Sequence, residues 1–548
     1  MPIFTAGLVG VDVFPQAVNA QAIKARDRSE ADRVFMGDGY SNAMFQRHSD
    51  RVIVGNHAFL DVARALTPPL VRHHVRPLTG LDPIDGRTLG KGDSCVLDFG
   101  THLVGHLSLR FAPVGSPPDA PLHVRLIFGE TRAEIAAAGT PDSGWLSSSW
   151  IQEDTFHVDV LPADIDLPRR YAFRYVRVDV LDTSPKYRVR IERARAETVS
   201  AVDAAAVAPL PKSAAPFRWL DDVSLRTLQN CMHGVFEDGP KRDRRLWLGD
   251  LRLQALVNYE TFRLNTLVKR CLYLFAAVPD ERGRIAASLF VEPEVVPDDT
   301  YLFDYSLAFV TVLRDYFAAT GDRAALQALW PSALRQLALA LESLDRHAIV
   351  RDADGWWSFV DWHVDLNKQA ASHAILVATL RHGAELAAVI DPGRSADLLA
   401  EAQRLAAAAR DRLWDPAVGF FVSGAGRQVS AASQVWMALA EVLEPRENAA
   451  LLRRLRTEPP AIGLRTPYAH HFLVDALLRT GEREAALAVL ESYWGGMLKH
   501  GADTFWEVFD PSDPTFSPYG SLRLNSYCHA WSCTPAYFIR KGCFDAGA

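Results

Sequence analysis

Carboxylates, arginines and a tryptophan crowd into the segment 237–250, which reads EDGPKRDRRLWLGD. Gly239-Pro240 interrupts the helical sequence on either side, because proline has no amide donor and the residue before it avoids helical angles. The segment is therefore a loop between two helices. Its three aspartates are Asp238, Asp243 and Asp250. The loop could hold only Asp–Arg pairs, but Trp247 favours a site, since aromatic rings beside carboxylates and arginines are a common sugar-binding surface.

Four further loops combine aromatic side chains with acidic residues or histidines. They are EPEVVPDDTYLFDY (292–305), DGWWSFVDWHVDLNKQ (354–369), RTPYAHH (465–471) and HGADTFWEVFDPSDPTFSPYG (500–520). A hydrophobic core needs aromatic residues, but it does not need tryptophan beside Asp, His and Glu in loop after loop. Because burying unpaired carboxylates is costly, we expect these loops to line a polar cleft. Rings that stack on pyranoses and carboxylates that bind hydroxyls together predict a carbohydrate site.

Hydrolysis of a glycosidic bond needs two carboxyl groups on opposite sides of that bond, one protonated and one ionised. The candidate pair is an acid from the segment 237–250 and Glu507. Glu507 could instead be a helix N-terminal charge or a salt-bridge partner. The competing carboxylates are Asp304, Asp361 and Asp365. The sequence has no GxSxG, HExxH or P-loop pattern, so other hydrolase and nucleotide-dependent mechanisms lack their motifs.

The composition is that of a globular protein of two to three domains, with 548 residues, 49% hydrophobic and 23% charged. A net charge of -7 argues against a nucleic-acid partner, which needs a basic face. No apolar run is long enough for a membrane span, and the N-terminal sequence does not resemble a signal peptide. Six scattered cysteines without a CxxC pair fit a reducing cytoplasm, without a metal or other cofactor.

An antiparallel β-sandwich is predicted ahead of the helical sequence. Apolar and polar residues alternate in five runs that Pro, Gly and Asp turns separate. The runs are 94–100, 102–114, 121–130, 154–162 and 169–182. We therefore expect a β-sandwich over 76–200, with the segment 1–75 belonging to the same β region. The Ser-, Gly- and Trp-rich loop 139–150 is expected to pack on the neighbouring domain.

A linker rich in alanine and proline, 201–216, leads to a helical domain over 217–548. Apolar residues recur there at spacings of three and four. The predicted helices span 219–236, 250–277, 302–319, 323–345, 368–390, 394–413, 430–443, 446–456, 468–479, 483–498 and 526–540. Glycine caps are expected at Gly321 and Gly481. Helices in hairpin succession indicate a closed (α/α)6 barrel, because the alternative, an open solenoid, would show a fixed repeat length and none is present.

At this point the residues resemble a known family. Asp238-Gly-Pro-Lys-Arg242-Asp243 with Trp247-Leu-Gly249-Asp250 resembles the D-x-P-x-R-(D/E) and W-x-G-D signature of the bacterial α-L-rhamnosidases of glycoside hydrolase family 78. The segment DTFWEVFD (503–510) resembles the T-x-W-E segment of that family, and CHAWS (528–532) followed by Pro535 resembles its closing helix. Asp304-Tyr305 and Val360-Asp361-Trp362 also match, so the motifs extend over about 217–541. LDFG (97–100) and IFGE (127–130) resemble the preceding sandwich.

The resemblance implies an inverting exo-glycosidase in which Glu507 is the general base. Family members commonly have a glutamate after Arg-Asp as the general acid, whereas here Arg244 follows Asp243 and the segment is one residue shorter. Asp243 precedes Asp250 by seven residues, as the acid of the family precedes its own aspartate, so Asp243 is the predicted acid and Asp238 the alternative. Arg242 and Arg244 would favour the ionised form of Asp243 unless burial and the neighbouring aspartates oppose them.

The remaining site residues are assigned to the sugar. Asp238 and Asp250 are expected to bind hydroxyls, Arg242 to orient them, and His529 to reach the ring. The other predicted substrate-binding residues are Trp247, Asp304, Asp361, Trp362, Trp506 and Trp531. The expected substrate is a terminal α-L-rhamnose on a short glycoside or oligosaccharide. The alternatives are a different terminal sugar, or a non-catalytic carbohydrate-binding relative, which Arg244 would favour; the oligomeric state stays open.

Overall fold

The computed structural model describes residues 56–78, 87–139, 144–351 and 356–545. The chain divides into two units, Met1–Val54 and Gly55–Ala548, and the first lies wholly outside the described residues. The predicted N-terminal segment 1–75 is therefore described only from residue 56 onward. That part forms the helix α3 (His57–Ala65), which Asn56 caps by accepting a hydrogen bond from the amide of Phe59, and the strand β1 (Val71–Val75).

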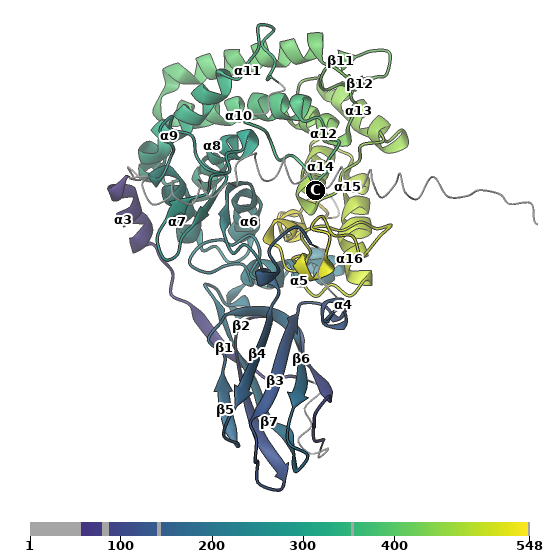
Figure 1. Cartoon of the computed structure of the whole chain (residues 1–548). Helices are drawn as coiled ribbons and strands as arrows, with labels where there is room; N and C mark the ends of the chain where they lie inside the picture. Colours follow the sequence, from purple (N-terminus) through teal and green to yellow (C-terminus); the bar gives the residue numbers. More distant parts are fainter. Residues whose placement is uncertain (1–55, 79–86, 140–143, 352–355, 546–548) are drawn as a thin grey trace, which may run out of the picture. The chain divides into compact units, whose positions relative to one another are not determined.

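Within the described residues, seven strands form one continuous antiparallel sheet in the order β1-β7-β2-β6-β3-β4, with β5 also paired to β2 (Figure 1). Besides β1, the strands are β2 (Ser94–Gly115), β3 (Leu122–Gly129), β4 (Glu153–Val158), β5 (Ala163–Asp166), β6 (Tyr171–Asp182) and β7 (Tyr187–Ser200). The antiparallel pairing predicted from the alternating pattern is confirmed. β1, β5 and β7 were not predicted, and the two runs 94–100 and 102–114 form the single strand β2.

The long strand β2 belongs to both halves of the sheet. Residues 94–105 pair with β6, and residues 105–115 pair with β7. Gly105 lies where the two pairings meet, and a Cβ added there would lie 2.0 Å from the carbonyl oxygen of Glu197. Glycine therefore permits the close approach of the two strands. Buried aromatic side chains, among them Phe99, Phe111 and Phe173, fill the core of this β region.

Helices make up most of the chain beyond the sheet. They are α5 (Arg218–Gln229), α6 (Leu248–Glu260), α7 (Asn265–Ala277), α8 (Phe303–Thr320), α9 (Arg323–Leu341), α10 (Gln369–Ile390), α11 (Pro392–Arg412), α12 (Ala431–Leu439), α13 (Pro445–Thr457), α14 (Pro467–Arg479), α15 (Arg483–Val489), α16 (Gly495–Lys499) and α17 (Pro535–Arg540). A π-helical turn, Leu490–Trp494, joins α15 to α16. Gly321 and Gly481 both have positive φ, as expected of glycines that end helices.

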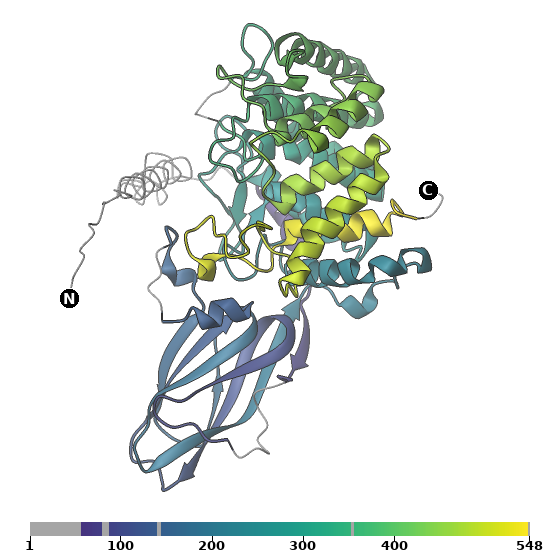
Figure 2. The ribbon, with the colours of Figure 1, turned by 90° about the vertical axis from the view of Figure 1, so that its right-hand side faces the viewer.

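Alternate helices pack side by side around a ring. α6 packs on α8, α8 on α10, α10 on α12, and α12 on α14. The 3₁₀ turn η7 (Ala530–Ser532) contacts both α14 and α6. The intervening helices α7, α9, α11, α13 and α15 each pack against the helix that precedes them, so that successive helices form hairpins (Figures 1 and 2). The side chains at the ends of the ring helices are thereby brought close together, although they are far apart in the sequence.

Three predicted helices were wrong in extent. The predicted helix 219–236 ends at Gln229, the last residue of α5. The predicted helix 250–277 is broken into α6 and α7, because Asn258 accepts the amide of Leu264 through its side chain and Arg263 adopts a φ of 56°. The predicted helix 526–540 is α-helical only in α17, with the 3₁₀ turn η7 before it. Before Pro535, the backbone amides of His529 and Ala530 donate to distant carbonyls instead of to a helix of their own.

Helix α10 is long and apolar enough to cross a membrane by length and composition alone. In the structure, 67% of its most apolar window is buried inside the protein. The helix contacts α8, α9, α11 and α12, which surround it. This burial is what the central helix of a helical domain shows.

Mild acid is expected to destabilise the protein through three buried histidines. Burial lowers the pKa of His373 and His529 to about 4 and that of His471 to about 3. In the unfolded chain the pKa of histidine is about 6.5. As the pH falls below this value, the unfolded chain takes up protons that the folded chain excludes, so the free energy of unfolding falls. Between pH 7 and 5.5, each of these histidines should lower the free energy of unfolding by roughly 1 kcal/mol. Chemical denaturation at the two pH values measures this change.

A matched pair of variants isolates this effect. His373→Gln should lose part of the pH dependence, because the buried imidazole is replaced by a side chain that does not titrate. His347→Gln should keep the full dependence, since His347 is exposed. Equal stability of the wild-type protein at pH 7 and 5.5 would contradict the prediction.

Candidate active site

Arg242 joins the two carboxyl groups that the sequence predicted to be catalytic. Its guanidinium donates to Oε2 of Glu507 at 2.6 Å and to Oδ1 of Asp243 at 3.2 Å. Its Nε donates to the carbonyl oxygen of Leu524 at 3.0 Å, which fixes the plane of the group. Because a guanidinium is a rigid fork, the two bonded carboxyl oxygens lie within about 8 Å of each other. Arg242 and Glu507 are 265 residues apart in the chain, so only the fold brings them together.

Tyr519 is a site residue that the sequence analysis did not single out. Its hydroxyl donates to Oε1 of Glu507, and the guanidinium of Arg242 lies 4.2 Å from the centre of its ring. Trp145 supports it from the β region, since the indole donates to the carbonyl of Pro518 at 3.0 Å and its ring lies 5.7 Å from that of Tyr519. Both carboxylate oxygens of Glu507 therefore have a fixed donor. The predicted packing of the loop 139–150 on the neighbouring domain is confirmed at Trp145.

The backbone at Asp243 is held in an uncommon conformation. Asp243 and Arg244 have φ values of 62° and 54°, in the left-handed region that favours glycine. Arg244 is turned away from the carboxyl cluster, because its guanidinium donates to the carbonyls of Pro240 at 2.8 Å and Arg170 at 2.7 Å. Two consecutive left-handed residues persist only where their surroundings fix them. Arg242 is thus the cation that the structure pairs with Asp243.

Asp238, Asp250 and His529 form the other side of the cluster. Nε2 of His529 lies 3.9 Å from Oδ2 of Asp238, and Nδ1 lies 3.7 Å from Oδ1 of Asp250. Oδ1 of Asp238 accepts the amide of Arg245 at 3.0 Å. Within the described residues, Oδ1 of Asp250 and Nδ1 of His529 are buried and have no hydrogen-bond partner. Such atoms are costly to leave unsatisfied, so they are suited to bind hydroxyls of a ligand.

The four clustered carboxyl groups influence one another. Burial raises the pKa of Asp238 well above its usual value, and Asp243 and Asp250 raise it further. The pKa of Asp250 is raised in the same way, first by burial and then by the charges of Glu507 and Asp243. Burial also keeps His529 neutral at neutral pH. The cluster can therefore hold protonated and ionised carboxyl groups side by side, which acid–base hydrolysis requires.

Aromatic rings surround this cluster. Trp531 donates from its indole to the backbone carbonyl of Glu507 at 3.0 Å and stacks on Phe359 at 5.6 Å. Trp362 meets the ring of Tyr519 edge to face at 5.9 Å, and Trp247 is half-buried. Trp531 and Trp362 thus contact Glu507 and its partner Tyr519, and the stacking of these rings on a sugar stays a prediction.

Gly249 allows α6 and α8 to pack closely beside the carboxyl cluster. A Cβ added at Gly249 would lie 2.3 Å from the ring of Tyr305. Tyr305 is buried, and its ring meets that of Trp247 edge to face at 6.2 Å. Packing therefore explains the glycine of the W-x-G-D motif, because a residue without a side chain lets α6 approach α8 closely enough to place Asp250 at the cluster.

Two other predicted site residues hold the backbone of the loops. Asp304 accepts the amides of Phe359 at 3.0 Å and Val360 at 2.9 Å. Asp361 accepts the amides of Arg465 at 2.8 Å and Thr466 at 3.0 Å. Their oxygens are thus occupied by the protein itself, and the geometry favours a positioning role over contact with a substrate.

Two further predicted residues lie outside the cluster. Trp506 packs edge to face on Phe509 and Tyr527 in the hydrophobic core. Asp365, named as a competing carboxylate, is exposed. Residues 352–355, at the start of the predicted loop 354–369, lie outside the described residues.

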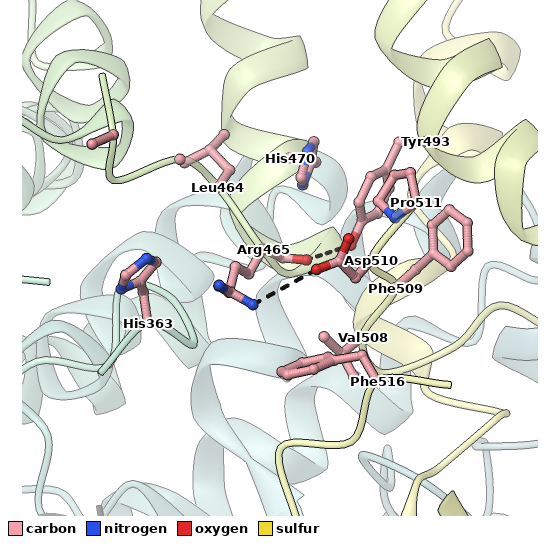
Figure 3. A pocket seen from close by; sticks show the side chains of 12 residues that line it. His363, Leu464, Arg465, His470, Tyr493, Val508, Phe509, Asp510, Pro511 and Phe516 are labelled. Atoms are coloured by element: carbon pink, nitrogen blue, oxygen red, sulfur yellow. Dashed lines mark hydrogen bonds and ion pairs between the residues drawn. The ribbon is translucent and has the colours of Figure 1, made fainter. Parts of the chain in front are cut away.

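A cavity of about 300 Å³ opens near this cluster but is not centred on it (Figure 3). Its walls include His363, which follows Trp362 in the chain, and Val508, which follows Glu507. Figure 3 shows Arg465 reaching toward Asp510, with Nη1 3.8 Å from Oδ2. Asp510 is the sole carboxylate on these walls, whereas hydrolysis needs a pair. The cluster, and not this cavity, is therefore the candidate active site.

Metal-binding and disulfide chemistry have little support in the part of the chain that the structure describes. No group of three or more His, Cys, Asp or Glu side chains there could hold a metal ion. All six cysteines are free thiols, and five of them are buried. The cytoplasmic location expected from the cysteines stays a prediction.

Two family models match the chain over its two structural regions. Residues 70–198 match the glycosyl hydrolase family 78 α-rhamnosidase N-terminal domain. Residues 210–542 match the bacterial α-L-rhamnosidase six-hairpin glycosidase domain, which is more than half of the chain. The chain belongs to glycoside hydrolase family 78. It is a glycoside hydrolase, as the carboxylate loops predicted.

Solved structures of rhamnosidases resemble this one. A rhamnosidase from Klebsiella oxytoca with rhamnose bound is 48% identical, with a TM-score of 0.87 over 89% of this chain and 99% of that chain. The family 78 rhamnosidase of Bacillus sp. GL1 is 24% identical, with a TM-score of 0.68 over 81% of this chain and 46% of the other. The Streptomyces avermitilis α-L-rhamnosidase complexed with L-rhamnose is 17% identical, with a TM-score of 0.61 over 86% of this chain and 44% of that chain.

The first of these structures covers nearly the same length as this family 78 chain, whereas the chain spans less than half of the other two. At identities below 25%, the latter two bear on the fold alone. No curated protein sequence matches the chain.

Proposed function

We propose that this chain is an α-L-rhamnosidase that removes terminal α-L-rhamnose from short glycosides with inversion of configuration. The observation that carries the proposal is the carboxyl pair Asp243 and Glu507, bridged by Arg242, in a chain 48% identical to a Klebsiella oxytoca rhamnosidase whose structure contains rhamnose. The match over 99% of that protein's length supports proposing the same activity for this chain.

Asp243 is the proposed general acid. It gives its proton to the glycosidic oxygen as the bond from that oxygen to the anomeric carbon breaks. Glu507 is the proposed general base, which takes a proton from the water that attacks the anomeric carbon on the opposite face. Inverting enzymes separate the two carboxyl groups by about 6.5–9.5 Å to leave room for that water. The upper limit of about 8 Å that Arg242 sets is compatible with this separation.

Asp238, Asp250 and His529 are the proposed sugar-binding residues. The unsatisfied atoms of Asp250 and His529 would each gain a partner from a ring hydroxyl, which offsets the cost of their burial. Trp247, Trp362 and Trp531 would supply the apolar faces that pack on the carbon atoms of the sugar. Asp304 and Asp361 are proposed to hold the loop that carries Trp362, and Trp506 to pack beneath Glu507.

We also propose that the ring of helices is a closed (α/α)6 barrel and that the β region is a sandwich. Support for closure comes from η7, which contacts both the first and the last long helix of the ring. Support for the sandwich comes from β2, which pairs with β6 along one part and with β7 along the other. The division into 76–200, 201–216 and 217–548 stays a prediction; β1 pairs with β7, so the sheet already begins at Val71.

A panel of aryl glycosides, with proton NMR of the product, tests the proposed function. We expect hydrolysis of the 4-nitrophenyl α-L-rhamnoside and β-L-rhamnose as the first anomer released. Release of the α-anomer first would contradict inversion. Cleavage of another aryl glycoside with no activity on the rhamnoside would assign a different terminal sugar. Binding of rhamnose by calorimetry without cleavage of any glycoside would indicate a non-catalytic relative.

A further inference from the structure

A second cluster of buried titratable groups lies outside the proposed active site. It consists of His102, Glu130, Glu134 and Lys241, whose side chains are at most 5% exposed. Nζ of Lys241 lies 3.3 Å from Oε2 of Glu130 and donates to Oε1 of Glu134. Nε2 of His102 bonds to Oε1 of Glu130 at 2.9 Å. Three of the four residues belong to the β region, and Lys241 belongs to the loop of Asp243.

Each of the two glutamates is held by a further contact besides Lys241. Glu130 directly follows β3, and its Oε2 also accepts the amide of Tyr527 at 2.7 Å. Glu134 lies in the short helix α4 (Arg132–Ala136), and its second oxygen accepts the amide of Thr131 at 2.8 Å as part of a capping box. Lys241 therefore meets two carboxylates whose positions were set independently of the loop it comes from.

A buried ion pair of this kind specifies position more than it adds stability. Desolvation of the charges offsets most of their attraction, whereas removal of one partner leaves an uncompensated buried charge. Lys241 is held on both sides by carboxylates, so the backbone of the loop cannot shift without separating them. The position of Lys241 relative to the β region is thus strongly determined.

A second anchor lies on the other side of Asp243. Arg244 donates to the carbonyl of Arg170, which precedes β6 in the β region, at 2.7 Å. The two anchors at Lys241 and Arg244 lie on either side of Asp243, and Asp243 and Arg244 both have a left-handed backbone. Strain of this kind persists where neighbouring contacts over-determine the conformation. These two contacts explain how the loop accommodates an arginine at position 244.

We propose that the β region positions the acid: Lys241, held by Glu130 and Glu134, and Arg244, held by the carbonyl of Arg170, clamp the loop on either side of Asp243. The clamp aims the carboxyl group of Asp243 at the glycosidic oxygen. Lys241 and Arg244 are positioning residues that need not touch the substrate. This inference rests on the proposed function, because it assigns them to the proton that Asp243 donates.

Two α-L-rhamnosides with different leaving groups test the clamp. A 2,4-dinitrophenyl rhamnoside leaves without a proton, whereas a methyl rhamnoside needs one from the general acid. Lys241→Met and Arg244→Met are each expected to lower kcat/KM on the methyl rhamnoside by about ten- to a hundred-fold, since a displacement of about 1 Å can cost that much. The rate on the dinitrophenyl rhamnoside should fall less than about threefold. Arg244→Lys, which keeps a donor, should recover part of the loss.

Equal losses on both substrates, or none, would overturn the clamp while leaving the proposed function intact. Glu134→Gln gives the same comparison if Lys241→Met does not fold, because it keeps the volume and a hydrogen-bond acceptor. Asp221→Asn is the matched control, since Asp221 pairs with Arg540 at 2.7 Å in another buried ion pair, between α5 and α17. The Asp221→Asn variant should change kcat/KM on the two rhamnosides by the same factor. A wild-type protein inactive on both rhamnosides would overturn both proposals together.

Discussion

Replacing Glu507 by glutamine is expected to lower kcat on 4-nitrophenyl α-L-rhamnoside by about two to four orders of magnitude. Glutamine keeps the size of the side chain, its oxygen can still accept from Arg242 and its amide can donate to the hydroxyl oxygen of Tyr519, but it cannot take the proton of the attacking water. Arg242 retains its bonds to Asp243 and to the carbonyl of Leu524, so the fold should be preserved. Release of 4-nitrophenol measures the rate, and thermal unfolding checks the fold.

Sodium azide separates loss of the base from other damage. Azide is a nucleophile that needs no deprotonation, so it should restore turnover of Glu507→Gln and yield the β-L-rhamnosyl azide. Glu491→Gln is the matched control, because Glu491 is exposed and should leave kcat unchanged. Full activity of Glu507→Gln would contradict the assignment, and a rate that azide does not raise would assign Glu507 a role other than base.

The parts of the site that the sequence predicted are those carried by motifs with fixed spacing. Asp238, Arg242 and Asp243 lie on one loop, and Asp250 lies in the first turn of α6, which follows that loop closely in the chain. Glu507 could be added because its segment has its own motif. The composition of the loops predicted that the ligand is a carbohydrate, since tryptophan beside carboxylates recurs in several of them. These signals are local, and each can be read without knowing how the chain folds.

The residues that sequence reasoning missed act through long-range contacts. Tyr519 is one of several aromatic residues in the loop 500–520, and no local feature separates it from Phe516 or Phe509. Its importance comes from meeting both Arg242 and Glu507, which only the fold creates. Lys241 could not be singled out from the sequence either, because its partner Glu134 is 107 residues away, in the β region.

The errors in helix extent have a related cause. The apolar spacing of residues 526–534 fits a helix, but their backbone and side-chain groups are engaged elsewhere. The amide of Ala530 donates to the carbonyl of Asp238, and the hydroxyl of Ser532 donates to that of Trp506. These contacts tie the segment to both catalytic loops. Tertiary contacts thus override local helix preference where the chain builds the site.

Replacing Asp243 by asparagine is expected to produce a loss that depends on the leaving group. Asparagine is nearly the same size but has no proton to give, so hydrolysis of methyl α-L-rhamnoside should fall by about two to four orders of magnitude. The 2,4-dinitrophenyl rhamnoside needs no such proton and should lose less than about tenfold. Both values of kcat/KM are measured under the same conditions, and their ratio is independent of the fraction of folded enzyme.

The neighbouring aspartates make this substitution a test of which residue is the acid. The charge of Asp243 helps to raise the pKa of Asp238 and of Asp250, so its removal should leave the fold at least as stable. Asp243→Glu keeps a proton donor on a longer side chain and should retain part of the activity on the methyl rhamnoside. If Asp243→Asn lowers both rates equally while Asp238→Asn shows the selective loss, the acid is Asp238. In that case the bond from Arg242 to Asp243 serves only to orient the guanidinium toward Glu507.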